Sequence, residues 1–142
     1  MKELTTEIII NASAERVWQV LTNFSSYQEW NPFIVSSSGK AVEGTHLTNQ
    51  MKQGDNTMTF SPKLVKVEKN HRLEWLGHLW VPKLFDGHHI FVIEELAPQQ
   101  VKLIQEEKFN GLLRSLIMKQ IAESTRAGFV AMNRALKERA EQ

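Results

Sequence analysis

The C-terminal stretch, residues 111–142, carries a helical pattern that constrains everything upstream of it. Apolar or small residues recur there at steps of three or four, which places them on one stripe of a helix. A helix of about thirty residues is roughly 45 Å long, which is long for a chain of 142 residues. Such a stripe is buried only against something large, so we expect a curved sheet wrapped around this helix. The stripe contains Leu113, Ile117, Ile121, Thr125, Gly128, Phe129, Met132 and Leu136.

The residues before the helix predict strands joined by short turns. The first expected strand is followed by two short helices, one carrying Trp18 and the other Trp30. Pro62 predicts an edge or a bulge in the strand that contains it. Short turns between successive strands imply antiparallel pairing, so we predict an α+β fold with a curved antiparallel sheet of about seven strands. The expected strands cover residues 4–10, 33–38, 45–52, 57–67, 72–80, 88–96 and 101–109.

Composition narrows the class of protein. A chain of this length is most simply a single domain, residues 1–142. The net charge of +1 does not favour nucleic acid as a partner, and the absence of cysteine excludes disulfides and thiolate chemistry. No apolar run is long enough to predict insertion into a membrane, and the first residues lack the pattern of a signal peptide. We therefore expect a cytoplasmic protein.

Three segments resemble one known superfamily. They are residues 13–33, residues 73–77 with 85–91, and residues 107–113 followed by 125–137. On these segments the chain resembles the START-like superfamily, also called SRPBCC or helix-grip, and in particular its bacterial polyketide cyclase/dehydrase-like branch. The resemblance implies a cavity between the sheet and the long C-terminal helix that holds an apolar small molecule.

The last expected strand, residues 101–109, has one charged face and one mainly apolar face. Alternate residues of a strand share a face, and the charged one suits water. Gln105, Glu107 and Phe109 should then point toward the helix. An inward carboxylate is costly unless it is paired or hydrogen-bonded, and its pKa could be raised.

The strand before it, residues 88–96, adds a histidine to the same region. The family resemblance places His89 and Phe91 on the inner face, so His89 should lie near Gln105 or Glu107. One interpretation makes these three polar residues anchors for a ligand in an apolar pocket. The other is that they hydrogen-bond to each other, to a tryptophan indole or to a buried water.

The remaining candidate ligand contacts are apolar. Trp75 lies in the middle of a strand on the face expected to point inward, although core packing alone also explains it. Met132 is conformationally adaptable, which suits a site for ligands of varied shape. The helix wall is expected to consist of Leu113, Ile117, Ile121, Phe129 and Met132.

The sequence predicts no metal site and no cofactor. His88 and His89 point to opposite faces of a strand, and the other histidines show no ligand spacing. There is no glycine-rich phosphate loop and no GxSxG nucleophile motif.

Three functions remain open. The leading hypothesis is non-catalytic binding of a hydrophobic small molecule, such as a lipid or an aromatic or polyketide-like metabolite. The second is an enzyme of the cyclase/dehydrase type, a lyase or isomerase, with Glu107 and His89 as general acid and base. The third is a protein-interaction module similar to the heat-shock ATPase activator domains, which a filled cavity and an exposed apolar patch would favour.

Overall fold

The computed structural model describes residues 2–53, 55–78 and 85–142, and within them the fold is α+β as predicted. The elements in chain order are β1 (Lys2–Ile10), α1 (Ala14–Thr22), the 3-10 helix η1 (Phe24–Ser26), α2 (Tyr27–Trp30), β2 (Ile34–Ser38), β3 (Thr48–Gln53), β4 (Asn56–Phe60), β5 (Lys63–Glu68), β6 (Arg72–His78), β7 (Asp86–Ala97), β8 (Gln100–Asn110) and α3 (Arg114–Ala140).

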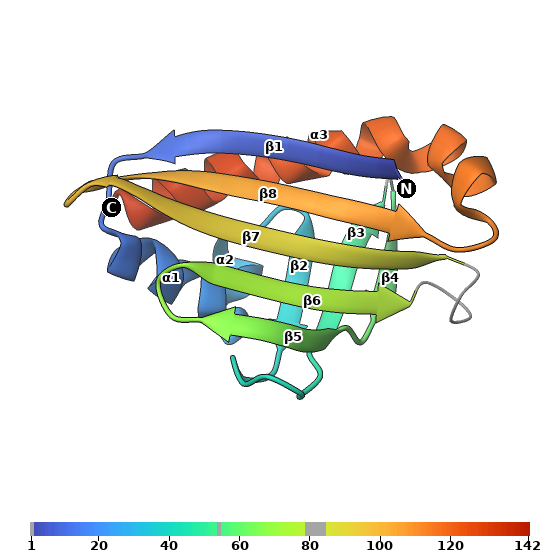
Figure 1. Ribbon diagram of the computed structural model, residues 1–142, viewed down its shortest axis with the longest axis horizontal. Helices are drawn as coiled ribbons and strands as arrows, with labels where there is room; N and C mark the ends of the chain where they lie inside the picture. Colours follow the sequence, from blue (N-terminus) through green and yellow to red (C-terminus); the bar gives the residue numbers. More distant parts are fainter. Residues whose placement is uncertain (1, 54, 79–84) are drawn as a thin grey trace.

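The strands form two antiparallel sheets. The larger has the order β1-β8-β7-β6-β5 and the smaller the order β2-β3-β4. Figure 1 shows the strands of the small sheet running across those of the large sheet on its far side, with α3 behind β1 and β8 on that same side. The large sheet therefore faces both α3 and the small sheet, which is the helix-grip arrangement predicted from the sequence.

The strand predicted over residues 57–67 is in fact two strands in two different sheets. Pro62 lies between β4 and β5, has no N–H for a ladder, and accepts a hydrogen bond at its carbonyl from the Leu47 N–H at 2.9 Å. The strand predicted to start at Thr45 begins at Thr48 instead. The structure thus has more strands than the predicted seven. The predicted end of β6 at Trp80 lies outside the described residues.

Helix α1 is capped at its N-terminus and is bonded to the C-terminal end of α3. The Ser13 side chain caps α1 by accepting the Arg16 N–H at 3.1 Å. The Arg16 guanidinium donates in turn to the carbonyl oxygens of Arg139 and Ala140, at 3.0 and 3.3 Å. These carbonyls at the end of α3 have no helical partner, so Arg16 ties α1 to the C-terminal end of the long helix.

The inner stripe of α3 forms one side of the core. Gly128 lies where a Cβ would overlap the Phe33 ring, which allows the segment before β2 to pack closely on the helix. Phe33 meets Phe129 edge-on with ring centroids 5.6 Å apart. Among the described residues, no helix has the length and hydropathy to cross a membrane. The predicted stripe is confirmed by its buried members, Ile117, Thr125, Phe129, Met132 and Leu136.

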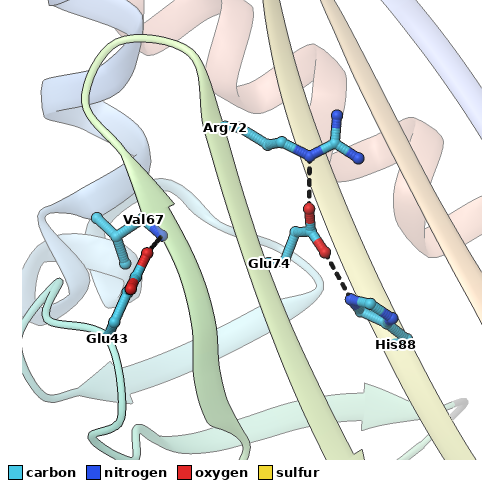
Figure 2. Close-up of polar contacts among 5 residues, drawn as sticks. All are labelled: Glu43, Val67, Arg72, Glu74 and His88. Carbon is cyan, nitrogen blue, oxygen red and sulfur yellow. Dashed lines mark hydrogen bonds and ion pairs between the residues drawn. The ribbon is translucent and has the colours of Figure 1, made fainter.

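The outer face of the large sheet is polar. Figure 2 shows the Glu74 carboxylate between the Arg72 guanidinium, at 2.5 Å, and the His88 imidazole, at 2.7 Å. Burial alone raises the pKa of Glu74, but the hydrogen bonds from Arg72 and His88 outweigh it and lower the pKa overall. In the same view Glu43 accepts the Val67 N–H at 2.9 Å. His88 thus belongs to the outer face, and His89, its neighbour, to the inner one.

Candidate functional site

A small cavity lies between the large sheet, the small sheet and α3. Its volume is about 20 Å³, which is room for about one water molecule. Most of its wall is apolar and aromatic, with three side chains that can form hydrogen bonds through carboxyl, imidazole or hydroxyl groups. The lining residues are Phe33, Ile34, Met51, Phe60, Trp75, Gly77, Gly87, His89, Glu107, Phe109, Ile121 and Thr125.

The pairing of β6, β7 and β8 brings three side chains of the cavity wall together. Trp75 of β6 pairs with His89 of β7, and His89 pairs with Glu107 of β8. Cross-strand partners project from the same face of a sheet, so the three side chains form one row across the inner face. The His89 Nδ1 and the Glu107 Oε1 lie 3.7 Å apart, which is too long for a hydrogen bond.

The Glu107 carboxyl is nearly buried and has no hydrogen-bond partner among the described residues. Its side chain is 15% exposed. One carboxyl oxygen lies directly over Gly87, where a Cβ would overlap it, so the glycine makes room for the acid. Burial raises the pKa of Glu107 from its ordinary value of 4.5 to about 8. Near neutral pH the group is therefore mainly an uncharged carboxylic acid.

The His89 imidazole is enclosed by aromatic rings. Its ring centroid lies 4.6 Å from that of Phe91, 4.9 Å from that of Phe129 and 5.1 Å from that of Trp75. Burial lowers the pKa of His89 from 6.5 to about 4, against the opposing effect of a hydrogen bond to Gln105. The imidazole is therefore neutral at pH 7.

A chain of buried polar side chains continues from His89 away from the cavity. His89 Nε2 lies 2.8 Å from Gln105 Oε1, and Gln105 Nε2 donates to Asn133 Oδ1 at 2.7 Å. The Asn133 amide donates to the Thr6 hydroxyl at 2.9 Å. The interpretation that these polar residues bond to one another is thus confirmed for His89 and Gln105, whereas Glu107 lies outside the chain.

The predicted site residues separate into two groups, and a role in ligand binding stays a prediction for all of them. Those that line the cavity are Trp75, His89, Glu107, Phe109 and Ile121. Those that are buried in the core without lining it are Phe91, Gln105, Ile117, Phe129 and Met132. Leu113 precedes the first residue of α3, is half-buried and does not line the cavity either.

The small sheet and the segment before it supply a wall of the cavity that was not predicted from the sequence pattern. The alternation of Leu47, just before β3, with Asn49 and Met51 in β3 was a usable signal, because Leu47 and Asn49 are fully buried and Met51 lines the cavity. Gly87 was another signal, since a glycine in a strand often marks a close approach. The lining residues outside the predicted site set are Phe33, Ile34, Met51, Phe60, Gly77, Gly87 and Thr125.

Asn49 is a second buried polar group with an unpaired atom, close to that wall although it does not line the cavity. Its Oδ1 accepts the Ser37 hydroxyl at 2.5 Å, but its Nδ2 has no hydrogen-bond partner among the described residues. Asn49 pairs across the sheet with Phe60 and lies two residues from Met51, so it shares their face. A buried amide left without an acceptor costs about 1–3 kcal/mol, so a water or a ligand is needed there.

The histidines are engaged separately rather than gathered. His78 contacts Asp86 at 2.7 Å and His88 contacts Glu74 at 2.7 Å, both on the outer face, while His89 bonds to Gln105 inside. Within residues 2–53, 55–78 and 85–142, no three side chains of histidine, aspartate or glutamate are grouped so that they could hold a metal ion.

Solved structures share this fold at low sequence identity. The Zhui aromatase/cyclase from Streptomyces sp. R1128 is 13% identical with a TM-score of 0.79, over 99% of this chain and 93% of that one. A START superfamily protein from Mycobacterium smegmatis is 18% identical with a TM-score of 0.76, over 99% and 97%. Norcoclaurine synthase from Thalictrum flavum is 14% identical with a TM-score of 0.73, over 96% and 84%. At these identities the likeness establishes the START-like fold alone.

Comparison of the sequence with protein families identifies the family. No curated protein matches it. A family profile described as "Polyketide cyclase / dehydrase and lipid transport" matches residues 1–141, almost the whole chain. The chain therefore belongs to the polyketide cyclase/dehydrase and lipid transport family.

Proposed function

We propose that this protein binds an apolar small molecule in the cavity and holds a polar group of that molecule at Glu107 and His89. The observation that carries the proposal is the Glu107 carboxyl, nearly buried and without a hydrogen-bond partner among the described residues. Buried polar groups almost always have partners, so this acid takes its partner from outside the chain, either a water molecule or a polar group of a ligand.

The electrostatics favour an uncharged ligand. Glu107 is mainly protonated and His89 is neutral near pH 7, because burial shifts both pKa values toward the uncharged forms. The rest of the wall is apolar or aromatic, and transferring a charge into such surroundings is costly. A lipid or an aromatic metabolite with one hydroxyl or carbonyl group fits this wall.

Binding requires the cavity to widen. A volume of about 20 Å³ is far below the roughly 300–1,000 Å³ of ligand pockets. The side chains best suited to move are Met51, which is unbranched and flexible, and Ile121, which is only half-buried. We therefore propose that ligand entry separates the small sheet and α3 from the inner face of the large sheet.

Native mass spectrometry of freshly purified protein, with thermal shifts over a library of neutral apolar compounds, tests the proposal. We expect a stoichiometric adduct or a saturable rise in Tm. Glu107→Gln should retain binding, because an amide both donates and accepts, whereas Glu107→Leu should weaken binding of compounds with a polar group at least about tenfold. Glu106→Gln, on the outer face of the same strand, is the matched control and should bind normally. Absence of any adduct and any shift would refute the proposal.

Acid–base catalysis is the second candidate, and one observation favours it specifically. A carboxylic acid with a pKa of about 8 lies 3.7 Å from a neutral imidazole on a cavity wall, a combination suited to proton transfer near neutral pH. An enzyme should lose turnover in Glu107→Gln while still binding its substrate. A binding protein should show no chemical change of a bound compound, which mass spectrometry of the recovered ligand detects.

A protein-interaction role is the third candidate. The cavity is small, and two leucines at and just before the start of α3 are exposed. Leu112 is 84% exposed and Leu116 is 62% exposed. Two exposed leucines are less than the large contiguous patch that marks an interface. If Leu112→Ser with Leu116→Ser leaves small-molecule uptake unchanged, the leucines are not part of the ligand site.

A further inference from the structure

The buried polar chain behind His89 has a defined direction. Gln105 Nε2 lies 2.7 Å from Asn133 Oδ1 and 3.5 Å from the backbone carbonyl of Phe129. At the other end, the Thr6 hydroxyl lies 3.3 Å from the backbone carbonyl of Gln105. A backbone carbonyl can only accept a hydrogen bond, so these two carbonyls show which groups in the chain must donate.

The direction can be followed residue by residue. Because Thr6 donates to a carbonyl, its oxygen is free to accept from the Asn133 amide, which leaves Asn133 Oδ1 facing Gln105. Gln105 then donates through Nε2 and presents Oε1 to His89. Reversing the side-chain amides of Gln105 and Asn133 would place Gln105 Oε1 against the Phe129 carbonyl oxygen. Thr6 would then have to donate to Asn133 Oδ1, and its hydrogen bond to the Gln105 carbonyl would be lost. This orientation is therefore the one that keeps the hydrogen bonds of Thr6, Asn133 and Gln105 together.

This direction determines which nitrogen of His89 carries the proton. Oε1 of Gln105 only accepts, so His89 Nε2 donates and carries the hydrogen. In the neutral imidazole Nδ1 is then a bare acceptor, and it points toward the Glu107 carboxyl at 3.7 Å. An acceptor facing an ionised carboxylate would be repelled, whereas an acceptor facing a carboxylic acid is not. The raised pKa of Glu107 is consistent with the second case.

We infer that Gln105, Asn133 and Thr6 are positioning residues that hold His89 with its N–H directed away from the cavity, so that His89 and Glu107 together offer one acceptor and one donor and select a ligand hydroxyl. This inference rests on the proposed function and names the chemical class of the ligand. A hydroxyl oxygen accepts from the Glu107 acid, and its hydrogen is donated to His89 Nδ1. A ketone or an ether can only accept, and so leaves Nδ1 buried without a partner.

The first test needs no ligand. Long-range ¹H–¹⁵N correlation spectra of the ¹⁵N-labelled protein at pH 7 report the tautomer of each histidine. We expect His89 as the Nε2–H tautomer in the wild type. Asn133→Leu frees Gln105 to rotate and should give a mixture of tautomers, whereas Asn133→Asp still accepts from Gln105 and should keep the wild-type state. The outer-face histidines His78 and His88 should not change in either variant.

The spectra can overturn the inference in two ways. An Nδ1–H tautomer of His89 in the wild-type protein contradicts it without any variant. An unchanged Nε2–H tautomer in folded Asn133→Leu contradicts the positioning role, because a merely structural asparagine would not set the tautomer.

The second test uses three probes with one apolar body: 2-naphthol, 2-methoxynaphthalene and naphthalene. By isothermal titration calorimetry we expect 2-naphthol to bind at least about tenfold more tightly than 2-methoxynaphthalene in the wild type, and the difference to fall below about threefold in Asn133→Leu. Equal binding of 2-naphthol and 2-methoxynaphthalene overturns the hydroxyl preference while leaving the proposed function intact. No binding of any probe contradicts both, and the tautomer in the spectra still decides the positioning role.

Discussion

At the scale of single residues, the Glu107 carboxyl and the His89 imidazole share a wall but respond to pH in opposite directions. Burial raises the pKa of Glu107 to about 8, so its contribution to stability is complete below pH 4.5 and is lost as pH rises to 8. Burial lowers the pKa of His89 to about 4, so its contribution is complete above pH 6.5 and is lost as pH falls. Of these two groups, Glu107 therefore dominates the change in stability between pH 6.5 and 8.

Glu107→Gln should therefore flatten the dependence of stability on pH in that window. The wild type should lose about 2 kcal/mol of unfolding free energy from pH 6.5 to 8, at about 1.4 kcal/mol per pH unit, and the variant should lose none of it. Urea denaturation at pH 6.5, 7.0, 7.5 and 8.0 measures the slope. Glu106→Gln, on the outer face, should retain the wild-type slope. Parallel curves for wild type and Glu107→Gln would mean that the acid is not buried as the structure has it.

At the scale of elements, a helix or strand could be predicted from the sequence where its pattern of apolar residues repeats over many positions. The stripe of α3 and the alternation of β8 repeat over many residues, so they predicted the inner face of the helix and the inward direction of Glu107 correctly. The inward direction of His89 came from the family resemblance, because the alternation of β7 alone leaves its two faces similar. The short strands β4 and β5 have no such length, and their assignment to different sheets depends on pairing with distant residues. The close approach allowed by Gly87 likewise exists only once β7 and β8 are paired.

The contact between α3 and the segment before β2 gives an element-scale prediction. Alanine in place of glycine inside a helix normally stabilises by about 1 kcal/mol. At Gly128 the added Cβ overlaps the Phe33 ring, and overpacking costs about 1–3 kcal/mol. We expect Gly128→Ala to destabilise by about 1 kcal/mol in urea denaturation, a sign opposite to helix propensity.

Two further variants separate the helix propensity from the overlap. Ala127→Gly, at the exposed neighbouring position, measures the propensity alone and should cost about 1 kcal/mol. In a Phe33→Leu background the overlap is relieved, so Gly128→Ala should become neutral or stabilising. If Gly128→Ala stabilises the wild type as well, the helix does not pack on Phe33 as closely as described.

At the scale of the whole molecule, the two sheets differ in how firmly they are held. The large sheet is a continuous ladder of five strands that includes the long pair β7 and β8. The small sheet has three short strands, and β4 is mostly exposed. Backbone hydrogen bonds join residues 44–47 to residues 62–64, such as Leu64 N to Thr45 O at 2.9 Å. These bonds tie one end of the small sheet to the large sheet, so if the cavity widens as proposed, we expect β3 and β4 to move about that end while the large sheet stays intact.

Amide hydrogen exchange should show this difference directly. Segments that open with few buried contacts exchange through low-energy local unfolding, so β3 and β4 should exchange at least about tenfold faster than the paired parts of β7 and β8. Saturating 2-naphthol should slow exchange in β3 and β4, because Met51 and Phe60 would then pack on the ligand, and should leave β7 and β8 almost unchanged. Equal exchange of the two sheets, or protection confined to β7 and β8, would mean that the cavity opens by another route, since a wall that does not open cannot admit a ligand of this size.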